Sequence, residues 1–578
     1  PPAAGSRRAA GTRRTSEPRA HQFGTRAAGE LGSRDDRVRH RHSSMRCADP
    51  PVSYGARVIM QRKAGVVLPL FSIRTRRDWG IGQISDLPAC AAWVRRAGQR
   101  LLQILPPHEL SGGETSPYGA LTAFGVDPIY VDVDAVGDLD AQAIELALGD
   151  DGRRTLERCR AAARVSYPEV RALKMRALRA AFDRFQAREW SRETPRARQL
   201  AAFMQRERAW LDDLALYTTL RESHNGWGWT TWPEPQRDRS DSALADIRAR
   251  EPGRLLEVAY VQWVLHEQWE AARAAMRDAG VELMGDLPFI VCAESADVWS
   301  HASQFQLHMS LGAPPDAYSA DGQDWGLPAY DWLAMEADDL AWIRARTVHA
   351  ARLYDRFRLD HVVGFFRQWV KRKDGGERGH FDPEGMDAQA ARGRRVLGAI
   401  LDELKQANHV EPPRALAEDL GVIPSFVRDV LRELGMPGYK VLPWEKGDDG
   451  QFRDPHSFPV ESIVSWSTHD TAPIVSWWDE LPEGDRAVLG RRAGVEPGMD
   501  ERARTLALLG DLYRASSNLA LVLSQELLGL RDRINTPATV GEQNWSWRLP
   551  RPIEELEGDA AVMARFDAVR ALVEASGR

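Results

Sequence analysis

The sequence predicts an α/β fold, namely a (β/α)8 TIM barrel with helical insertions between the barrel strands. The chain has 578 residues, which is too long for one small domain but suits a large barrel with insertions. Short apolar runs recur from about Arg62 onward, and helix-length amphipathic segments separate them. The apolar runs that we interpret as strands are 66–70, 101–105, 282–285, 357–359, 414–417, 439–442 and 463–466.

Two helices have clear ends in the sequence. The segment 255–279 is apolar at helical spacing and stops at Gly280, and the segment 425–434 stops in the same way at Gly435. Residues 135–255 are rich in Ala, Arg, Glu and Leu, and they end in an aromatic stretch at 227–233. We interpret this part as a helical insertion subdomain on the barrel.

Residues 1–55 differ from the rest because they contain paired arginines and few large apolar side chains. Such a segment cannot bury enough surface to offset its ordering entropy. It also lacks the apolar core of a secretory signal. We therefore predict an Arg-rich disordered extension at 1–55 and a catalytic barrel at 56–578.

Composition excludes several classes of protein. A formal charge of -6 argues against a protein held to nucleic acid by a positive field. The mean hydropathy is -0.44, and we find no apolar run near the roughly 18 residues of a membrane span. Four dispersed cysteines favour a reducing, cytoplasmic location over a disulfide framework. Cys/His metal clusters and nucleotide-binding motifs are missing, so no metal or cofactor is expected. Trp is unusually frequent, and a flat indole suits stacking on sugar rings or bases.

Acidic residues follow four of the predicted strands. In a barrel, catalytic groups collect at the C-terminal ends of the strands, where the loops converge on one cleft. This rule selects Asp286, Asp360, Glu418 and Asp470. Spacing alone leaves open a simpler interpretation, in which each acid forms a buried salt bridge that fixes a loop.

Two neighbouring carboxylates in different environments are what retaining glycoside chemistry requires. Arg358 precedes Asp360 by two residues, so strand alternation points both side chains to one side, and the Arg charge would keep Asp360 ionised as a nucleophile. Of Glu418 and Asp419, only one can face inward. The charge of Asp419 would then help to keep an inward Glu418 protonated for acid/base work. Asp470 could bind sugar hydroxyls.

Long motifs in a fixed order give the sequence a family resemblance. From about Arg62 to Leu549, the chain resembles the 4-α-glucanotransferases, also called amylomaltases or disproportionating enzymes, of glycoside hydrolase family 77. The motifs are GVVLPLFSIRTRRDWGIG (65–82), ETSPYGALTAFGVDPIYVDVD (114–134), GDLPFIVCAESADVW (285–299), GAPPDAYSADGQDWGLPAYDW (312–332), RLDH (358–361), AEDLG (417–421), STHD (467–470), RIN (533–535) and NWSWRL (544–549).

The resemblance implies a retaining double displacement on α-1,4-glucans through a covalent glucosyl-enzyme intermediate. It implies Asp360 as nucleophile, Glu418 as acid/base and Asp470 as transition-state stabiliser. The remaining positions that match family residues near the bound glucan are Tyr118, Asp286, Gln323, Trp325, Arg358, His469, Trp444 and Asn535. The segment 312–332 corresponds to an active-site loop.

Donors would be maltooligosaccharides or dextrins derived from starch or glycogen, and acceptors would be maltooligosaccharides or glucose. Neither nucleic acid nor a membrane is an expected partner.

The sequence departs from the family pattern at three places, the third of which concerns the contacts of its loop. Gly119 replaces a common Ser, Leu359 replaces a common Ile, and the residues after Asp470 lack an Asn-Asp pair found in many members. Two alternatives stay open beside the transferase. One is an α-amylase-like retaining hydrolase with the same three acids, and the other is a catalytically inactive glucan-binding protein, against which the intact acids argue.

Overall fold

The computed structural model describes residues 61–111, 113–315, 322–375, 379–407, 414–537 and 539–578. The predicted extension at 1–55 lies outside these residues, as do residues 316–321 of the predicted active-site loop. None of the described helices is both long enough and apolar enough to cross a membrane.

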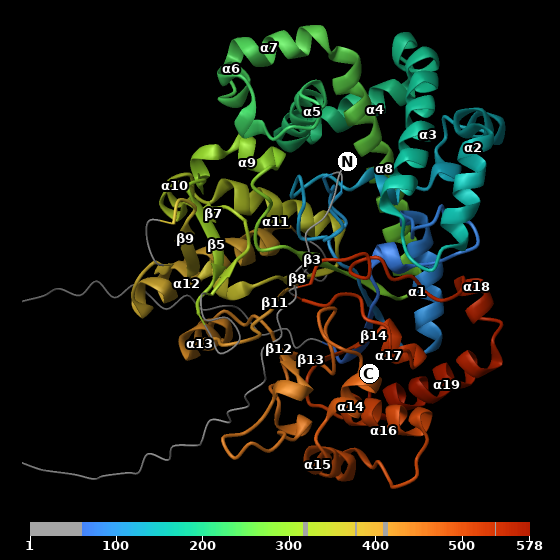
Figure 1. Cartoon of the computed structure of the whole chain (residues 1–578), viewed down its shortest axis with the longest axis vertical. Coiled ribbons are helices and arrows are strands. Elements are labelled where there is room, and N and C mark those ends of the chain that lie inside the picture. The colour runs from blue at the N-terminus through green and yellow to red at the C-terminus, as the bar shows by residue number, and fades with distance from the viewer. Residues whose placement is uncertain (1–60, 112, 316–321, 376–378, 408–413, 538) are drawn as a thin grey trace, which may run out of the picture. The chain divides into compact units, whose positions relative to one another are not determined.

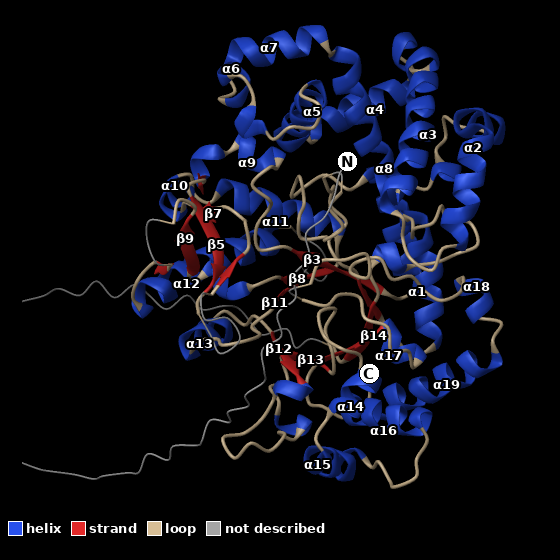
Figure 2. Ribbon diagram, in the orientation of Figure 1, coloured by secondary structure: helices blue, strands red, loops and turns tan. Residues whose placement is uncertain are grey.

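Eight parallel strands close into a barrel, which confirms the predicted fold class (Figures 1 and 2). Around the barrel their order is β1-β14-β13-β12-β11-β8-β3-β2. The strands are β1 (Lys63–Val67), β2 (Leu101–Gln103), β3 (Glu282–Leu287), β8 (Arg356–Leu359), β11 (Arg414–Ala417), β12 (Gly438–Val441), β13 (Ser462–Ser465) and β14 (Leu519–Leu523). Seven of them coincide with the predicted runs to within a few residues. The eighth, β14, was not predicted.

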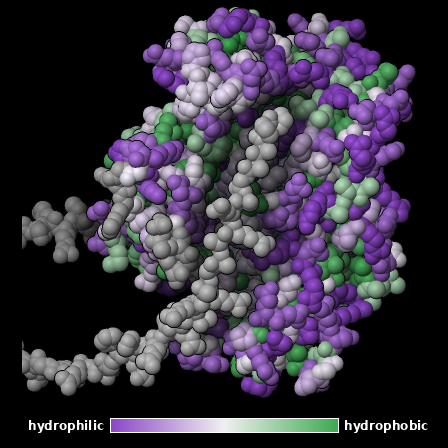
Figure 3. All heavy atoms as spheres, in the orientation of Figure 1, coloured by the Kyte–Doolittle hydropathy of each residue, from purple (hydrophilic) through white to green (hydrophobic). Residues whose placement is uncertain are grey.

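Helices α2 to α7 are inserted between β2 and β3, and in Figure 1 α4 to α7 lie together above the barrel. Their bounds are α2 (Ala141–Ala161), α3 (Tyr167–Arg188), α4 (Pro195–Arg206), α5 (Arg208–Ser223), α6 (Glu234–Arg237) and α7 (Asp241–Arg250). All of these helices except the short α6 bury some side chains and leave others to solvent. Figure 3 accordingly shows mostly hydrophilic side chains on the visible face.

The other helices cover the barrel or follow its strands. They are α1 (Leu87–Arg96), α8 (Pro252–Asp278), α9 (Ala296–Ser300), α10 (Trp332–Ala337), α11 (Ala341–Leu353), α12 (Met386–Gln406), α13 (Ser425–Glu433), α14 (Ile474–Glu480), α15 (Glu483–Ala493), α16 (Glu501–Tyr513), α17 (Ser524–Leu528), α18 (Ile553–Leu556) and α19 (Ala560–Ala575). The predicted ends of α8 and α13 are confirmed, because Gly280 and Gly435 adopt φ values of 69° and 67° just after them.

Two small antiparallel sheets lie beside the barrel and were not predicted. The larger has the order β10-β9-β5-β6 and the smaller pairs β4 with β7. Their strands are β4 (Phe305–Gln306), β5 (Met309–Ala313), β6 (Gln323–Asp324), β7 (Ala329–Tyr330), β9 (Gln368–Arg372) and β10 (His380–Asp382). These sheets hold the described ends of the segment 312–332.

A glycine lets β3 approach its neighbour closely. A Cβ on Gly285 would lie 2.4 Å from ring atoms of Tyr354, which is closer than any side chain tolerates. Tyr354 is fully buried between α11 and β8. The Gly-Asp sequence at 285–286 therefore allows β3 to pack tightly while the next residue, Asp286, points into the barrel.

Candidate active site

Strand register brings the candidate acids to one end of the barrel. Asp286 of β3 is paired in register with Arg358 of β8, and Leu359 is paired with Ala417 of β11. Asp360 and Glu418 follow these last two residues directly, so they leave neighbouring strands at the same level. The main chain continues this alignment, since the Glu418 N–H donates to the Leu359 carbonyl at 3.0 Å.

The Arg358 guanidinium lies at the centre of the cluster. It donates to both carboxylate oxygens of Asp286, at 2.8 and 2.7 Å. Its Nη2 lies 2.9 Å from Asp360 Oδ1 and 3.8 Å from Glu418 Oε2. Burial opposes the Arg358 charge, but Asp286 and Asp360 outweigh burial and raise its pKa well above the ordinary range. The predicted contact between Arg358 and Asp360 is therefore present as an ion pair.

These contacts limit the gap between the two candidate catalytic carboxylates. Oxygens of Asp360 and Glu418 lie within 2.9 and 3.8 Å of one nitrogen, so the gap cannot exceed the sum of those distances. Retaining glycosidases place their carboxyl groups about 5–5.5 Å apart, and inverting enzymes place them roughly 6.5–9.5 Å apart. The sum lies slightly above the lower limit of the inverting range, so it excludes all but the low end of that range.

Glu418 is held as a protonated acid at neutral pH. Burial raises its pKa, Arg358 opposes this rise and the charge of Asp360 adds to it, so that the pKa lies at about 8. Its Oε2 accepts the main-chain N–H of His361 at 2.7 Å. His361 can direct this N–H at Glu418 because its backbone adopts a φ of 46°, a region that non-glycine residues rarely occupy.

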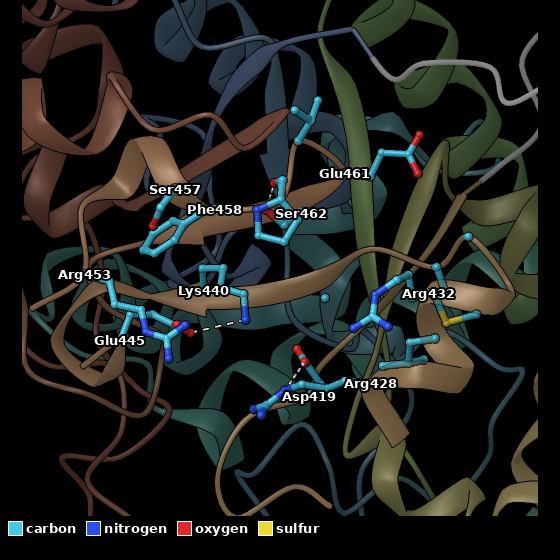
Figure 4. A pocket seen from close by; sticks show the side chains of 16 residues that line it. Asp419, Arg428, Arg432, Lys440, Glu445, Arg453, Ser457, Phe458, Glu461 and Ser462 are labelled. Carbon is cyan, nitrogen blue, oxygen red and sulfur yellow. Dashed lines mark hydrogen bonds and ion pairs between the residues drawn. The ribbon is translucent and has the colours of Figure 1, made fainter. Parts of the chain in front are cut away.

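The adjacent acid, Asp419, faces away from the cluster. It accepts the Tyr439 N–H at 2.7 Å, forms an ion pair with Arg428 at 3.2 Å, and lines a separate cavity of about 850 Å³ on the outer side of β12 (Figure 4). The alternation predicted for Glu418 and Asp419 is thus present. The expectation that Asp419 raises the Glu418 pKa is corrected, because the charge beside Glu418 is that of Asp360.

The loop after β13 carries His469 and Asp470. His469 Nε2 lies 3.2 Å from Asp470 Oδ2, and the Asn535 amide donates to Asp470 Oδ1 at 2.7 Å. Burial works against an ionised Asp470, but His469 and Asn535 outweigh burial and hold its pKa well below the ordinary value. The Asp470 side chain is 42% exposed, compared with 24% for Asp360 and 13% for Glu418. It therefore offers an ionised carboxylate to the cleft.

Tyr118 connects Asp286, which contacts Arg358, with His469 in the loop after β13. Its hydroxyl donates to Asp286 at 2.8 Å and lies 3.0 Å from His469 Nε2. The Tyr118 and His469 rings also stack, and Trp545 packs against both of them. Sequence reasoning missed Trp545, although its motif at 544–549 belongs to the resemblance. Its positive φ of 58° marks a constrained backbone at the site.

Trp325 and Gln323 contact each other, and Trp325 also contacts His361. The Trp325 indole donates to Gln323 Oε1 at 3.0 Å, and its ring meets the His361 ring edge-on at 5.1 Å. His361 in turn contacts Glu418. Trp444 lies in the turn after β12, and its side chain is half exposed.

Fold and site together define a barrel enzyme with several acids at the C-terminal ends of its strands. The family model described as 4-alpha-glucanotransferase, glycoside hydrolase family 77, matches residues 68–554. The chain therefore belongs to this family and is an enzyme of the glycosyltransferase type.

Similar proteins agree with this assignment. A chloroplastic/amyloplastic 4-alpha-glucanotransferase from Oryza sativa subsp. japonica is 30% identical over 87% of this chain and 82% of its own length. A 4-alpha-glucanotransferase from Chlamydia caviae is 29% identical, covering 86% and 92% respectively. The structure of an amylomaltase from Streptococcus agalactiae in complex with acarbose aligns with a TM-score of 0.75 and 26% identity, over 90% of this chain and all of that one.

Proposed function

We propose that this enzyme moves α-1,4-glucan segments from a donor to a maltooligosaccharide or glucose acceptor by retaining double displacement. One observation carries the proposal. A single guanidinium, that of Arg358, lies beside both Asp360 and Glu418, while Glu418 remains protonated up to about pH 8. An ionised carboxylate next to a neutral one supplies the nucleophile and the acid that the reaction needs.

In the first step, the Asp360 carboxylate attacks the anomeric carbon of the donor. The glycosidic bond breaks, and Glu418 gives its proton to the departing oxygen. The glucosyl unit is then an ester of Asp360, and Glu418 is ionised. Its new charge lies 3.8 Å from Arg358 and accepts the His361 N–H, so both contacts stabilise the anion as it forms.

In the second step, an acceptor hydroxyl attacks the same carbon from the face that the first leaving group vacated. Glu418 takes the proton of that hydroxyl, the ester bond to Asp360 breaks, and the two inversions give net retention. Asp470 would bind donor hydroxyls and stabilise positive charge on the sugar ring. His469 and Asn535 hold its carboxylate ionised for that role.

Transfer differs from hydrolysis only in the hydroxyl that attacks the intermediate. Transfer therefore requires a site that binds a sugar in line and excludes water. The indole of Trp325 lies against His361, next to the group that activates the acceptor. We assign Trp325 and Gln323 to this acceptor side and Trp444 to a more distant part of it. A cytoplasmic location remains a prediction.

Incubation with maltotriose tests the function. A transferase produces glucose and longer oligosaccharides while the total number of reducing ends stays constant. Rising reducing ends would instead establish the α-amylase-like hydrolase, and unchanged maltotriose would establish a glucan-binding protein. Trapping the intermediate with a slow fluorinated glucosyl donor and locating the ester by mass spectrometry tests the mechanism, because an adduct on any residue other than Asp360 would refute it.

A further inference from the structure

A buried glutamate follows β14 and does not line the reaction centre. Glu526 is fully buried in α17, the helix that begins directly after β14. Its Oε2 accepts the main-chain N–H of Leu523, the last residue of β14, at 2.9 Å. The carboxyl group is thereby fixed to the end of one barrel strand. Glu526 takes no part in the two chemical steps proposed for Asp360 and Glu418.

The other oxygen of Glu526 contacts both ends of the loop that carries His469 and Asp470. Ser467 Oγ lies 2.6 Å from Glu526 Oε1, and the Ile474 N–H donates to the same oxygen at 3.1 Å. These two residues flank the loop on its N-terminal and C-terminal sides. One buried atom therefore anchors the segment from which Asp470 reaches the cleft.

Proton counting indicates the ionisation state of this anchor. A serine hydroxyl has one hydrogen, yet Ser467 Oγ lies within bonding distance of both Glu526 Oε1 and the Ala472 carbonyl, at 2.6 and 2.9 Å. With an ionised Glu526, the one Ser467 hydrogen must be shared between the two acceptors. A protonated Glu526 can instead donate to Ser467, which then donates to Ala472, so that each contact has a hydrogen of its own. Burial raises the pKa of Glu526, which agrees with a neutral acid.

The charge of Arg565 acts on Glu526, but its guanidinium bonds main-chain oxygens and not the carboxyl group. Arg565 donates to the main-chain carbonyls of Glu526 and Leu527, both at 2.8 Å. Inside the loop, the Thr471 N–H donates to the Thr468 carbonyl at 3.1 Å and closes the turn around His469 and Asp470. The loop thus has a tight centre, while its two ends depend on Glu526.

We propose that Glu526, as a neutral carboxylic acid, is a positioning residue that holds the 467–474 loop and thereby places Asp470 in the active site. The inference rests on the proposed function. Displacement of a catalytic group by about 1 Å can cost on the order of 10²-fold in rate. We expect Glu526→Gln to lower kcat by roughly ten- to a hundredfold, because an amide cannot both donate to Ser467 and accept the Ile474 and Leu523 N–H groups.

The decisive measurement is a double-mutant cycle with Asp470→Asn, assayed by maltotriose disproportionation. If Glu526 acts through Asp470, Glu526→Gln should change kcat less than about twofold in the Asp470→Asn background. Ser467→Ala should reproduce the loss in the wild-type background, and it serves as the test if Glu526→Gln does not fold. Asp86→Asn is the matched control, because Asp86 is a buried carboxyl that bonds Thr75 and the Gln83 N–H away from this loop.

Three results would overturn the inference. They are a kcat within twofold of wild type in folded Glu526→Gln and Ser467→Ala, a loss that multiplies with that of Asp470→Asn, or failure of both single variants to fold while Asp86→Asn folds. Wild-type enzyme that leaves maltotriose chain lengths unchanged would instead refute the proposed function. The two failures are therefore distinguishable.

Discussion

Replacing Glu418 with Gln should stabilise the folded enzyme at alkaline pH while removing its proposed acid/base group. The amide keeps an oxygen that can accept the His361 N–H, which Glu418 now accepts at 2.7 Å. It has no proton to lose. The change therefore isolates the cost of keeping this carboxyl protonated in a buried site next to Asp360.

The magnitude follows from the shift in the Glu418 pKa from 4.5 to about 8. Between these values the unfolded chain has released the proton and the folded protein still holds it. Because the unfolded chain then binds fewer protons, the free energy of unfolding falls as pH rises, by about 1.36 kcal/mol per pH unit for this group. The accumulated loss is on the order of 5 kcal/mol above pH 8. Glu418→Gln escapes this loss.

Urea denaturation followed by tryptophan fluorescence at several pH values measures the difference. The variant should match wild type near the acid end of this window and exceed it progressively up to the alkaline end. Glu496→Gln, a change at an exposed glutamate, should leave the wild-type pH dependence unaltered. A stability difference between Glu418→Gln and wild type that is constant with pH, or that shrinks as pH rises, would refute the assignment of a raised pKa to Glu418.

Three further predictions concern activity. Asp360→Asn should lower turnover by several orders of magnitude while circular dichroism stays unchanged, and near-normal turnover in the folded variant would contradict its role as nucleophile. The wild-type kcat/KM for maltotriose should decline above about pH 8, as Glu418 loses its proton; full activity well above that pH would show that another group is the acid. Tyr118→Phe removes bonds to Asp286 and His469 and should reduce kcat/KM by roughly tenfold or more, whereas an unchanged value would show that these bonds do not support catalysis.

Much of the barrel could be predicted from the sequence, because strands buried on both faces appear as short continuous apolar runs. Arg414–Ala417 was predicted with its observed bounds. The strand Leu519–Leu523 was missed although its run is wholly apolar, since further leucines at 527–528 blur its end. The small antiparallel sheets could not be predicted, because strands of two to five residues have too little periodicity to identify them.

The acids of the site were found from their positions after strands, but their contacts needed the register. Nothing in the sequence shows that Asp286 lies opposite Arg358, or that one guanidinium contacts three carboxylates. Glu526 escaped notice because its strand was missed. His361 adjoins Asp360 in the sequence, but only its unusual backbone conformation explains how its N–H reaches Glu418.

The register of β3, β8 and β11 fixes the positions of the acids, whereas the segment around Gln323 and Trp325 lies outside these strands. The sequences of these two parts of the enzyme can therefore change at different rates. A one-residue insertion in any of these strands would turn its acid out of the cleft, so their lengths are not free to vary. The segment around Gln323 and Trp325 belongs to a small separate sheet instead. Changes there that keep the contact between Trp325 and His361 can occur without shifting the strands that lead to Asp360 and Glu418. If Gln323 and Trp325 contact the acceptor, as proposed, evolution or a designer can alter which sugar is accepted while both catalytic carboxylates stay in place.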